Sequence, residues 1–282
     1  MKYKLPFVHL DINQQVVHSV QALKIQSGIA SEVEDFLTVE EILSISINGE
    51  SYTMTMRTPG NEEALARGIL LSEDVYNDLH TNPIFSIIEK NEFNYITKVN
   101  VDIPEGKIGK GILTKRNLVS VSSCGMCGKD EMDLTWVGEK IICHQKLNTK
   151  VLHQLFQKMS ALQENFKYSG GSHASAACTV DGELLVMHED IGRHNAVDKV
   201  IGSLLLENKL ERAQILLVSG RVSYEIVNKC YRACIPFLAA VSAPSSMAVL
   251  YCQQMGITLL AFCREDKMTV YTQEERVEMG FL

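Results

Sequence analysis

The feature that most constrains the fold is the alternation of strand-like and helical segments in the C-terminal half of the chain. Three nearly continuous apolar runs, Gln214–Ser219, Pro236–Ser242 and Ile257–Cys263, are each preceded by a segment with helical spacing. Apolar runs of this kind are typical of strands in a sheet that is covered on both faces. The alternation therefore predicts a layered α/β domain.

Neighbouring segments extend this domain. Apolar residues recur at helical spacing over Thr149–Tyr168, and Gly170-Gly171 follows, so we expect one long helix there. Asp181-Gly182 lies between two strand-like runs and predicts a hairpin. The other helices are expected at His194–Glu207, Ser223–Cys234 and Ser245–Met255. No charged residue occurs between Ile235 and Phe262, but prolines interrupt this stretch, and we expect buried sheet rather than a membrane span.

The N-terminal third predicts a smaller, β-rich domain, so that the chain as a whole is α+β. Two alternating runs between Phe36 and Met56 flank Asn48-Gly49 and predict a hairpin. A helix is expected at Glu62–Ser72 with Asn61 as its N-cap. Further strands are expected at Ile84–Glu89 and Tyr95–Ile103, whereas the weakly patterned residues 1–30 are expected to be peripheral. We predict domains at 1–115 and 148–282, joined by a loop at 116–147.

Composition limits the possible partners and location. The 282-residue chain has a net charge of −7, which argues against a general affinity for nucleic acid or anionic membranes. The first fifteen residues lack the apolar run and cleavage site of a secretory signal. Eight scattered cysteines in such a chain are expected to be mostly buried thiols in a reducing compartment. The predicted location is the cytoplasm.

The most reactive stretch of the sequence is Ser122–Lys129, which contains Cys124 and Cys127 among glycines and serines. Small neighbours leave sulfur accessible, and nearby basic residues favour the nucleophilic thiolate. Three interpretations remain open on these residues alone: a zinc site completed by Cys143 and His144, a redox dithiol, or a thiol that carries a group such as a persulfide. The dithiol is the weakest, because no helix is expected to begin at the pair.

A second site is expected where strands of the α/β domain end and helices begin. Ligands in open α/β sheets bind beyond the carboxyl ends of the strands, where free amides attract anions. The side chains there suit a phosphorylated or nucleotide-like ligand and are Arg193, His194, Arg221, Ser223, Ser245 and Ser246. Gly170–His173 is expected to add a flexible wall. The alternative is structural: Arg193 pairs with Asp190 or Asp198, and His173 and His188 only support the fold.

The strand and helix order is similar to that of the cytidine deaminase-like fold. Zinc deaminases need an H-x-E or C-x-E element followed by P-C-x-x-C. Here His188 and Glu189 are adjacent, and the cysteine pair precedes them without a proline. The deaminase activity is therefore not expected, whatever the topology.

Several blocks in a fixed order resemble the formate dehydrogenase accessory sulfurtransferase family, FdhD. These blocks are Arg57–Gly60, Gly68–Glu73, Ser122–Gly128, Gly170–Ala174, Glu189–Lys199, Ser219–Arg221, Ala239–Pro244 and Phe262–Arg264. One departure is Arg67, at a position where an apolar or small residue is expected.

The resemblance implies a sulfur carrier required for formate dehydrogenase activity. Such a protein takes persulfide sulfur from a cysteine desulfurase and passes it to the molybdenum (or tungsten) bis-guanine-dinucleotide cofactor. By resemblance, Cys124 holds the persulfide and Cys127 assists. The matching cofactor-binding stretch is Phe262, Cys263, Arg264, Glu265, Asp266 and Lys267. A homodimer with a cytidine deaminase-like C-terminal domain, and no tightly bound metal of its own, is also implied.

A competing hypothesis is a zinc-stabilised nucleotide-binding scaffold without sulfur transfer. In it, Cys124, Cys127, Cys143 and His144 bind the metal. The two hypotheses differ at Cys143, which a scaffold needs and a carrier does not.

Overall fold

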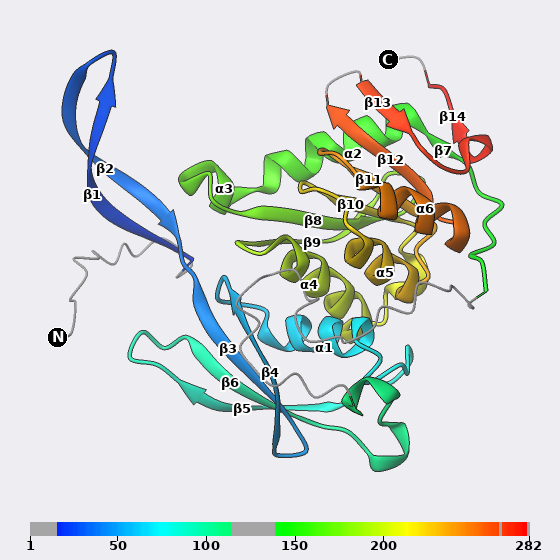
Figure 1. Cartoon of the computed structure of the whole chain (residues 1–282), viewed down its shortest axis with the longest axis horizontal. Coiled ribbons are helices and arrows are strands. Elements are labelled where there is room, and N and C mark those ends of the chain that lie inside the picture. Colours follow the sequence, from blue (N-terminus) through cyan, green and yellow to red (C-terminus); the bar gives the residue numbers. More distant parts are fainter. Residues whose placement is uncertain (1–15, 114–138, 265–266, 281–282) are drawn as a thin grey trace.

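The C-terminal part of the protein is built around a six-stranded mixed sheet (Figure 1). The computed structural model describes residues 16–113, 139–264 and 267–280. The strand order is β13-β12-β11-β10-β8-β9; β10, β11 and β12 are parallel, and the other three strands are antiparallel to their neighbours. The strands are β8 (His173–Cys178), β9 (Leu184–Asp190), β10 (Ile215–Val218), β11 (Phe237–Ala240), β12 (Thr258–Arg264) and β13 (Lys267–Val270).

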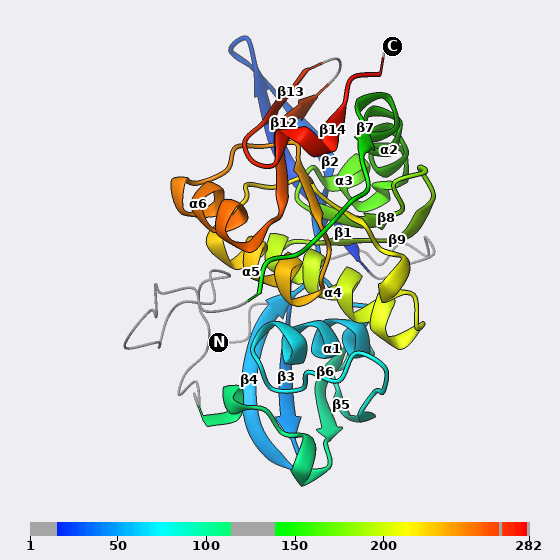
Figure 2. The ribbon, with the colours of Figure 1, turned by 90° about the vertical axis from the view of Figure 1, so that its right-hand side faces the viewer.

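Helices cover both faces of this sheet (Figures 1 and 2). Leu216 and Leu238 pack on the side of α4 (Arg193–Leu206), α5 (Tyr224–Arg232) and α6 (Ser246–Met255). Their sequence neighbours Leu217 and Phe237 pack on the opposite side, with α2 (Thr149–Leu162). Because successive strand residues face opposite sides, every position must be apolar. The predicted α/β class is confirmed.

The single helix expected over 149–168 is wrong, because the chain forms two helices. α2 ends at Leu162, and α3 (Glu164–Ser169) follows after Gln163. The carboxylate of Glu189 accepts hydrogen bonds from the backbone N–H groups of Asn165 and Phe166, at 2.8 and 2.9 Å. A carboxylate at this position satisfies the free amides of a new helix. A contact with β9 therefore starts α3, and local sequence does not reveal it.

The N-terminal part contains a four-stranded sheet with the order β4-β3-β6-β5 and one helix, α1 (Glu62–Ser72). The strands are β3 (Glu41–Ile47), β4 (Glu50–Arg57), β5 (Ile84–Lys90) and β6 (Ile96–Asp102). Helix α1 begins and ends as predicted, but the side chain of Asn61 makes no capping hydrogen bond, because Asn61 adopts a left-handed conformation (φ 58°). Glu62 instead accepts a hydrogen bond from the backbone N–H of Gly60.

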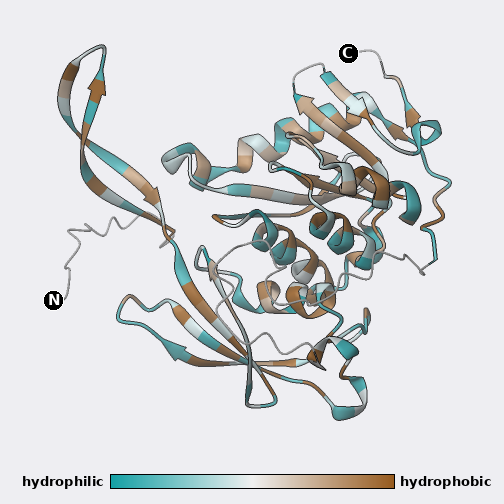
Figure 3. Ribbon diagram, in the orientation of Figure 1, coloured by the Kyte–Doolittle hydropathy of each residue, from teal (hydrophilic) through white to brown (hydrophobic). Residues whose placement is uncertain are grey.

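A long hairpin precedes this sheet and projects from the body (Figure 1). It consists of β1 (Val17–Gln26) and β2 (Ile29–Thr38), paired along their full length through a turn at Ser27-Gly28. Its tip carries exposed hydrophobic side chains, including Ile25 and Ile29 (Figure 3). The expectation that residues 1–30 are peripheral therefore did not include strand β1, which the structure shows within this range. With both faces of the hairpin largely exposed, the alternation that marks a half-buried strand is absent.

Helices α1 and α4 join the two parts and cross at two glycines. A Cβ at Gly202 would lie 1.8 Å from the carbonyl oxygen of Ala64, and one at Gly68 would lie 2.0 Å from that of Asp198. Only glycine permits this backbone approach. Buried polar groups flank the crossing: Lys199 contacts Asp190 at 2.8 Å and donates a hydrogen bond to the carbonyl of Thr58.

Short elements complete the described chain. β7 (Leu147–Asn148) pairs with β14 (Val277–Glu278), and four 3₁₀ turns occur, η1 (Glu105–Lys107), η2 (Lys110–Leu113), η3 (Leu210–Arg212) and η4 (Glu274–Arg276). No helix within the described ranges is long and apolar enough to cross a membrane. The division into domains at 1–115, 116–147 and 148–282, and the likeness to cytidine deaminases, stay predictions.

Candidate functional site

A cavity of about 860 Å³ lies at the carboxyl ends of the parallel strands, on the face of the sheet covered by α2 and α3. Ser219 follows β10, Val241 follows β11, and Cys263 and Arg264 end β12; all four line the cavity. The opposite wall comes from α2, α3 and the Gly170–His173 segment. This is the edge of the sheet where ligands bind in open α/β folds.

The described residues that line the cavity give it a cationic and aromatic character. Five of them carry basic or imidazole groups, and none is Asp or Glu, although the chain as a whole is acidic. The five are His153, Lys167, His173, Arg264 and Lys267. Phe156 and Phe166 add aromatic surface. Such a lining suits a ligand that combines negative charge with a flat ring system.

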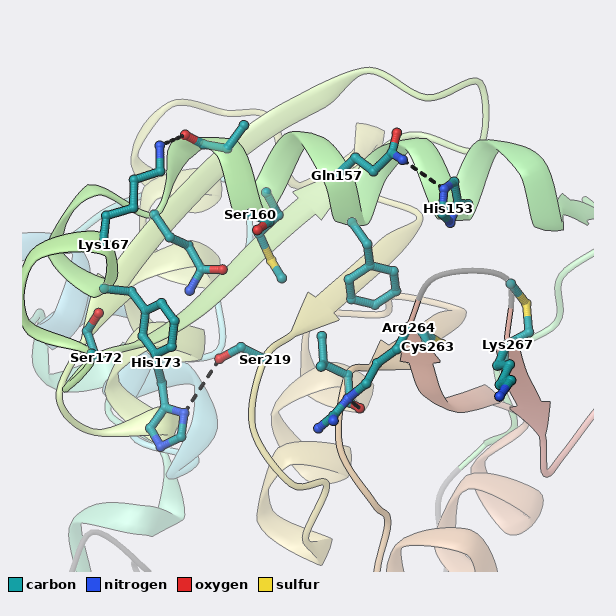
Figure 4. Close-up of a pocket in the computed structure, with 18 of the residues that line it drawn as sticks. His153, Gln157, Ser160, Lys167, Ser172, His173, Ser219, Cys263, Arg264 and Lys267 are labelled. Carbon is teal, nitrogen blue, oxygen red and sulfur yellow. Dashed lines mark hydrogen bonds between the residues drawn. The ribbon is translucent and has the colours of Figure 1, made fainter. Parts of the chain in front are cut away.

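The basic and imidazole groups approach the cavity from different elements (Figure 4). Arg264 and Lys267 come from β12 and β13, whereas His173 lies at the other end of the cavity, at the start of β8. The Nε of Arg264 donates a hydrogen bond to the carbonyl of Val241 at 3.2 Å. This bond fixes the arginine stem at the end of β11, beside the cavity.

His173 is held next to Ser219 and is uncharged at neutral pH. Its Nδ1 lies 3.5 Å from the Oγ of Ser219, which accepts a hydrogen bond from the backbone N–H of Ala174 at 2.9 Å. Burial, and then the nearby charge of Arg193, lower the pKa of His173. The neutral imidazole offers one donor and one acceptor to a ligand. His173 therefore lies in the cavity wall, as expected for Gly170–His173, and does not only support the fold.

The thiol of Cys263 is buried and protonated at neutral pH. It lines the cavity but is only 5% exposed. Burial raises its pKa to about 12, although a hydrogen bond from the Ala240 backbone opposes this change. The protonated thiol is a poor nucleophile. Cys263 therefore contributes shape to the cavity.

The cavity brings together only part of the predicted site. Cys263, Arg264 and Lys267 line it, and so do Gly170, Gly171, Ser172 and His173, as expected for the flexible wall. Phe262 lies outside the lining, is 45% exposed and has a left-handed backbone (φ 54°). Glu265 and Asp266 lie outside the described residues, as do Cys124 and Cys127.

The six residues predicted at helix starts are not part of the cavity lining. The Oγ of Ser245 accepts a hydrogen bond from the backbone N–H of Ala248, so it caps α6, and Ser246 begins that helix. His194 is buried and lies 3.0 Å from Glu225 and 3.4 Å from Ser223. These contacts stabilise helix ends on the other face of the sheet.

Arg193 and Arg221 lie closer to the cavity. Gly220 separates Arg193 from His173: a Cβ at Gly220 would lie 3.3 Å from the Cβ of Arg193 and 3.4 Å from the Nδ1 of His173. The charges of Arg193 and Arg221 both act on His173. The predicted pairing of Arg193 with Asp190 or Asp198 is wrong, because those carboxylates contact Lys199 and Lys229 at 2.8 and 2.7 Å.

Sequence reasoning missed the part of the cavity that α2 and α3 supply. The sequence predicts that His153, Phe156 and Phe166 lie within the helix expected at Thr149–Tyr168, and it assigns them no part in a site. The sequence contains a partial signal for this wall, because histidine, glutamine and serine interrupt an otherwise apolar helix face. The structure places these polar side chains on the cavity side of the helix. Only the tertiary packing of α2 over the sheet shows which of them meet the strand ends.

Among the described residues, no cluster of three or more His, Cys, Asp or Glu side chains is arranged to hold a metal ion. Cys143 is half-buried and contacts the carbonyl of Gln145. Since Cys124 and Cys127 lie outside the described ranges, the zinc hypothesis stays a prediction.

Comparisons with known proteins agree on one family. Residues 38–278 match the family model described as "FdhD/NarQ family". The chain is 38% identical over 264 residues to the sulfur carrier protein FdhD of Sulfolobus acidocaldarius, covering 93% of this chain and 99% of that protein. It is 38% identical over 270 residues to the protein of the same name from Mycolicibacterium paratuberculosis, with the same coverage.

A solved structure shares the fold. It is the crystal structure of a protein from Desulfotalea psychrophila assigned as a formate dehydrogenase accessory protein. The TM-score is 0.74 at 21% identity, over 93% of this chain and all of that chain. Together with the family match over most of the sequence, these similarities show that the chain belongs to the FdhD/NarQ family.

Proposed function

We propose that this protein is a sulfur carrier that activates formate dehydrogenase. It takes sulfur as a persulfide from a cysteine desulfurase and passes it to the molybdenum (or tungsten) bis-guanine-dinucleotide cofactor before that cofactor enters formate dehydrogenase. The proposal includes a cytoplasmic location and a homodimer. The cationic, aromatic-lined cavity in a chain of this family is the observation that carries it.

In this proposal the cavity binds a guanine nucleotide half of the cofactor. Its volume of about 860 Å³ lies within the range of roughly 300–1,000 Å³ that is common for small-molecule sites. Arg264 and Lys267 are suited to the pyrophosphate, because charge-assisted hydrogen bonds to phosphate oxygens are strong. The aromatic rings of Phe156 and Phe166 are suited to the base.

Sulfur transfer is assigned to Cys124, with Cys127 assisting. The Cys124 thiolate attacks the outer sulfur of the donor persulfide; a new S–S bond forms, the donor S–S bond breaks, and the donor cysteine leaves as a thiolate. On delivery, the cofactor donates the electron pair that forms its new bond to the outer sulfur, the S–S bond breaks, and the pair from that bond returns to Cys124 as a thiolate; the cofactor is thereby oxidised by two electrons. Cys263 is unsuited to this role because its buried thiol remains protonated.

A comparison of two cysteine variants tests the proposal. Cys124→Ala should abolish formate dehydrogenase maturation in cells that lack their own carrier, because no other thiol takes its place. The Cys143→Ala variant should give the same formate dehydrogenase activity as the unmodified chain, since a carrier does not need Cys143 as a zinc ligand. The measurement is formate dehydrogenase activity at matched carrier levels, with circular dichroism as a control for folding. Full formate dehydrogenase activity with Cys124→Ala would favour the scaffold hypothesis. Loss of both the folded structure and the bound zinc in Cys143→Ala would favour it as well.

A further inference from the structure

The chain on either side of residues 114–138, the segment that carries Cys124, is attached to the body at one place. On the N-terminal side, the backbone N–H groups of Gly109 and Gly111 donate hydrogen bonds to the carbonyls of Val75 and Asp74, at 2.8 and 3.0 Å. A Cβ at Gly111 would lie 1.8 Å from the carbonyl oxygen of Glu73. The backbone is therefore pressed directly against the turn that follows α1.

On the C-terminal side, the chain is attached to the ends of α5 and α6. The hydroxyl of Tyr231 donates a hydrogen bond to the carbonyl of Glu139 at 2.9 Å. The backbone N–H of Ile141 donates to the carbonyl of Met255, also at 2.9 Å. Tyr231 lies in the last turn of α5, and Met255 is the last residue of α6. This flank therefore begins where both helices end.

An ion pair joins the two attachments. Arg232, the last residue of α5 and the neighbour of Tyr231, contacts the carboxylate of Asp74 at 2.6 Å. Asp74 also receives a hydrogen bond from Asn77, and its carbonyl holds Gly111. Burial raises the pKa of Asp74, but the hydrogen bonds from Arg232 and Asn77 lower it overall, so the carboxylate is charged at neutral pH. Asp74 and Arg232 thus hold both flanks together.

This attachment lies at the edge of the sheet opposite the cavity. Helix α5 starts beyond the carboxyl end of β10 and ends before the amino end of β11, whereas the cavity lies at the carboxyl ends. Both flanks of the segment that carries Cys124 therefore lie at the edge of the sheet away from the cavity.

We propose that Asp74 and Arg232 are positioning residues for sulfur delivery. By holding the two flanks together at the end of α5, the pair fixes the point from which Cys124 reaches the cofactor in the cavity. The inference rests on the proposed role of Cys124 as the carrier. Asp74 and Arg232 both lie outside the cavity lining. The inference therefore makes sulfur delivery depend on residues that belong neither to the cysteine pair nor to the cavity.

A double-mutant cycle on the full-length protein tests this role. Asp74→Asn suits the left-handed backbone at this position (φ 63°), and Arg232→Gln retains most of the side chain. The matched control is Arg212→Gln, which breaks an ion pair of the same length with Glu183 elsewhere on the surface. Each protein is loaded by a cysteine desulfurase. Sulfur content, removal of that sulfur by cyanide, and the single-turnover rate of formate dehydrogenase activation are then measured.

Each single variant should accept one sulfur and lose it to cyanide at the unmodified rate, but activate formate dehydrogenase about five- to tenfold more slowly. The double variant should be no slower than either single variant, and Arg212→Gln should be unchanged. The inference would be overturned if the single variants activated formate dehydrogenase at the unmodified rate, or if their effects on that rate multiplied in the double variant. It would also be overturned if the rate of sulfur removal by cyanide changed in parallel with the activation rate.

A second readout separates this inference from the sulfur-carrier proposal. If the unmodified protein takes up no sulfur, the proposed function fails whatever the variants do. Hydrogen exchange of the flanking peptides 104–112 and 139–146 still reports on the pair. Both peptides should exchange at least threefold faster in Asp74→Asn and Arg232→Gln than in the control. Equal exchange in all four proteins would show that the pair does not hold the flanks.

Discussion

At the scale of single residues, buried charges explain positions that the sequence leaves unclear. Arg67 lies on α1 and is fully buried, yet each side of its guanidinium has a partner. It donates hydrogen bonds to Asn82 and to the carbonyls of Tyr76 and Asp78, and lies over the Tyr76 ring at 4.9 Å. Burial lowers its pKa to about 10, so it remains charged at neutral pH. Arg67 thus orders the loop after α1.

The same scale carries a prediction for the cavity. Arg264→Ala and Lys267→Ala should each weaken the binding of GDP, used as a probe, by about tenfold. A hydrogen bond to a charged group contributes about 1.5–3 kcal/mol, and about 1.4 kcal/mol corresponds to a factor of ten. Isothermal titration calorimetry measures the dissociation constants, with Arg212→Ala as a surface-charge control. Unchanged GDP affinity in both cavity variants would exclude the cavity as the nucleotide site.

His188 gives a pH-dependent prediction. Its Nε2 lies 2.7 Å from the Oγ of Ser203, and burial lowers its pKa to about 4. An unfolded chain has a histidine pKa near 6.5, so between pH 6.5 and 4 the unfolded state binds a proton that the folded state does not. The free energy of unfolding should therefore fall as the pH falls through this window, by up to about 1.4 kcal/mol per pH unit from this residue.

Urea denaturation of the unmodified protein and of His188→Gln at several pH values measures that contribution. Glutamine keeps a hydrogen-bonding side chain near Ser203 but has no titrating group. The difference in unfolding free energy between the two proteins should be constant above about pH 7 and shift in favour of the variant below pH 6. A pH-independent difference would contradict the assigned pKa.

At the scale of elements, the helix crossing of α1 and α4 explains two sequence blocks of the family resemblance. Gly68 belongs to one block, whereas Asp190 and Lys199 belong to another, and the structure brings both to the joint between the two sheets. Asp190 also accepts hydrogen bonds from the backbone of Thr58 and Gly192. Much of the Glu189–Lys199 block therefore supports the fold, rather than contacting a ligand in the cavity.

Replacing a glycine at this crossing should cost stability. Gly202→Ala places a Cβ 1.8 Å from the Ala64 carbonyl oxygen, so the helices must separate. Overpacking of this kind costs about 1–3 kcal/mol, and the midpoint of thermal unfolding should fall by several degrees. Gly106→Ala is the control, because no atom lies within 4 Å of its added Cβ. Calorimetry that finds both variants equally stable would contradict the close crossing.

The elements also show how far the sequence could predict the fold. Helices α1, α4, α5 and α6 and the central strands begin and end within a few residues of prediction, since each has a strong apolar pattern bounded by turn residues. The sequence could not predict the break at Gln163, which Glu189 imposes from β9. Nor could it predict the β1–β2 hairpin, whose exposed faces lack a pattern.

The candidate site divides in the same way. The family resemblance predicts Cys263, Arg264 and Lys267, and Gly170–His173 is predicted as a flexible wall; all of these residues line the cavity. Ser245 and Ser246 also have the right residue types at a helix start, but α6 lies on the other face of the sheet. Residue type and strand order identify an edge of a sheet, whereas only the three-dimensional packing identifies the face on which the cavity opens.

At the scale of the whole molecule, sulfur carriage and cofactor binding are assigned to different parts of the chain. The cavity lies at the carboxyl edge of the large sheet, and both flanks of the cysteine-bearing segment attach at the opposite edge. In the proposed function, the same thiol takes sulfur from the donor and delivers it to the acceptor. The central claim is therefore that Cys124 holds one transferable sulfur.

The most direct test is the mass of the intact protein after incubation with a cysteine desulfurase and cysteine, followed by peptide mapping. We predict a gain of one sulfur atom, located on Cys124 and removed by a reductant, and no gain in Cys124→Ala. A protein that gains no sulfur, or gains it equally in Cys124→Ala, would contradict the assignment of this chain as a carrier through Cys124.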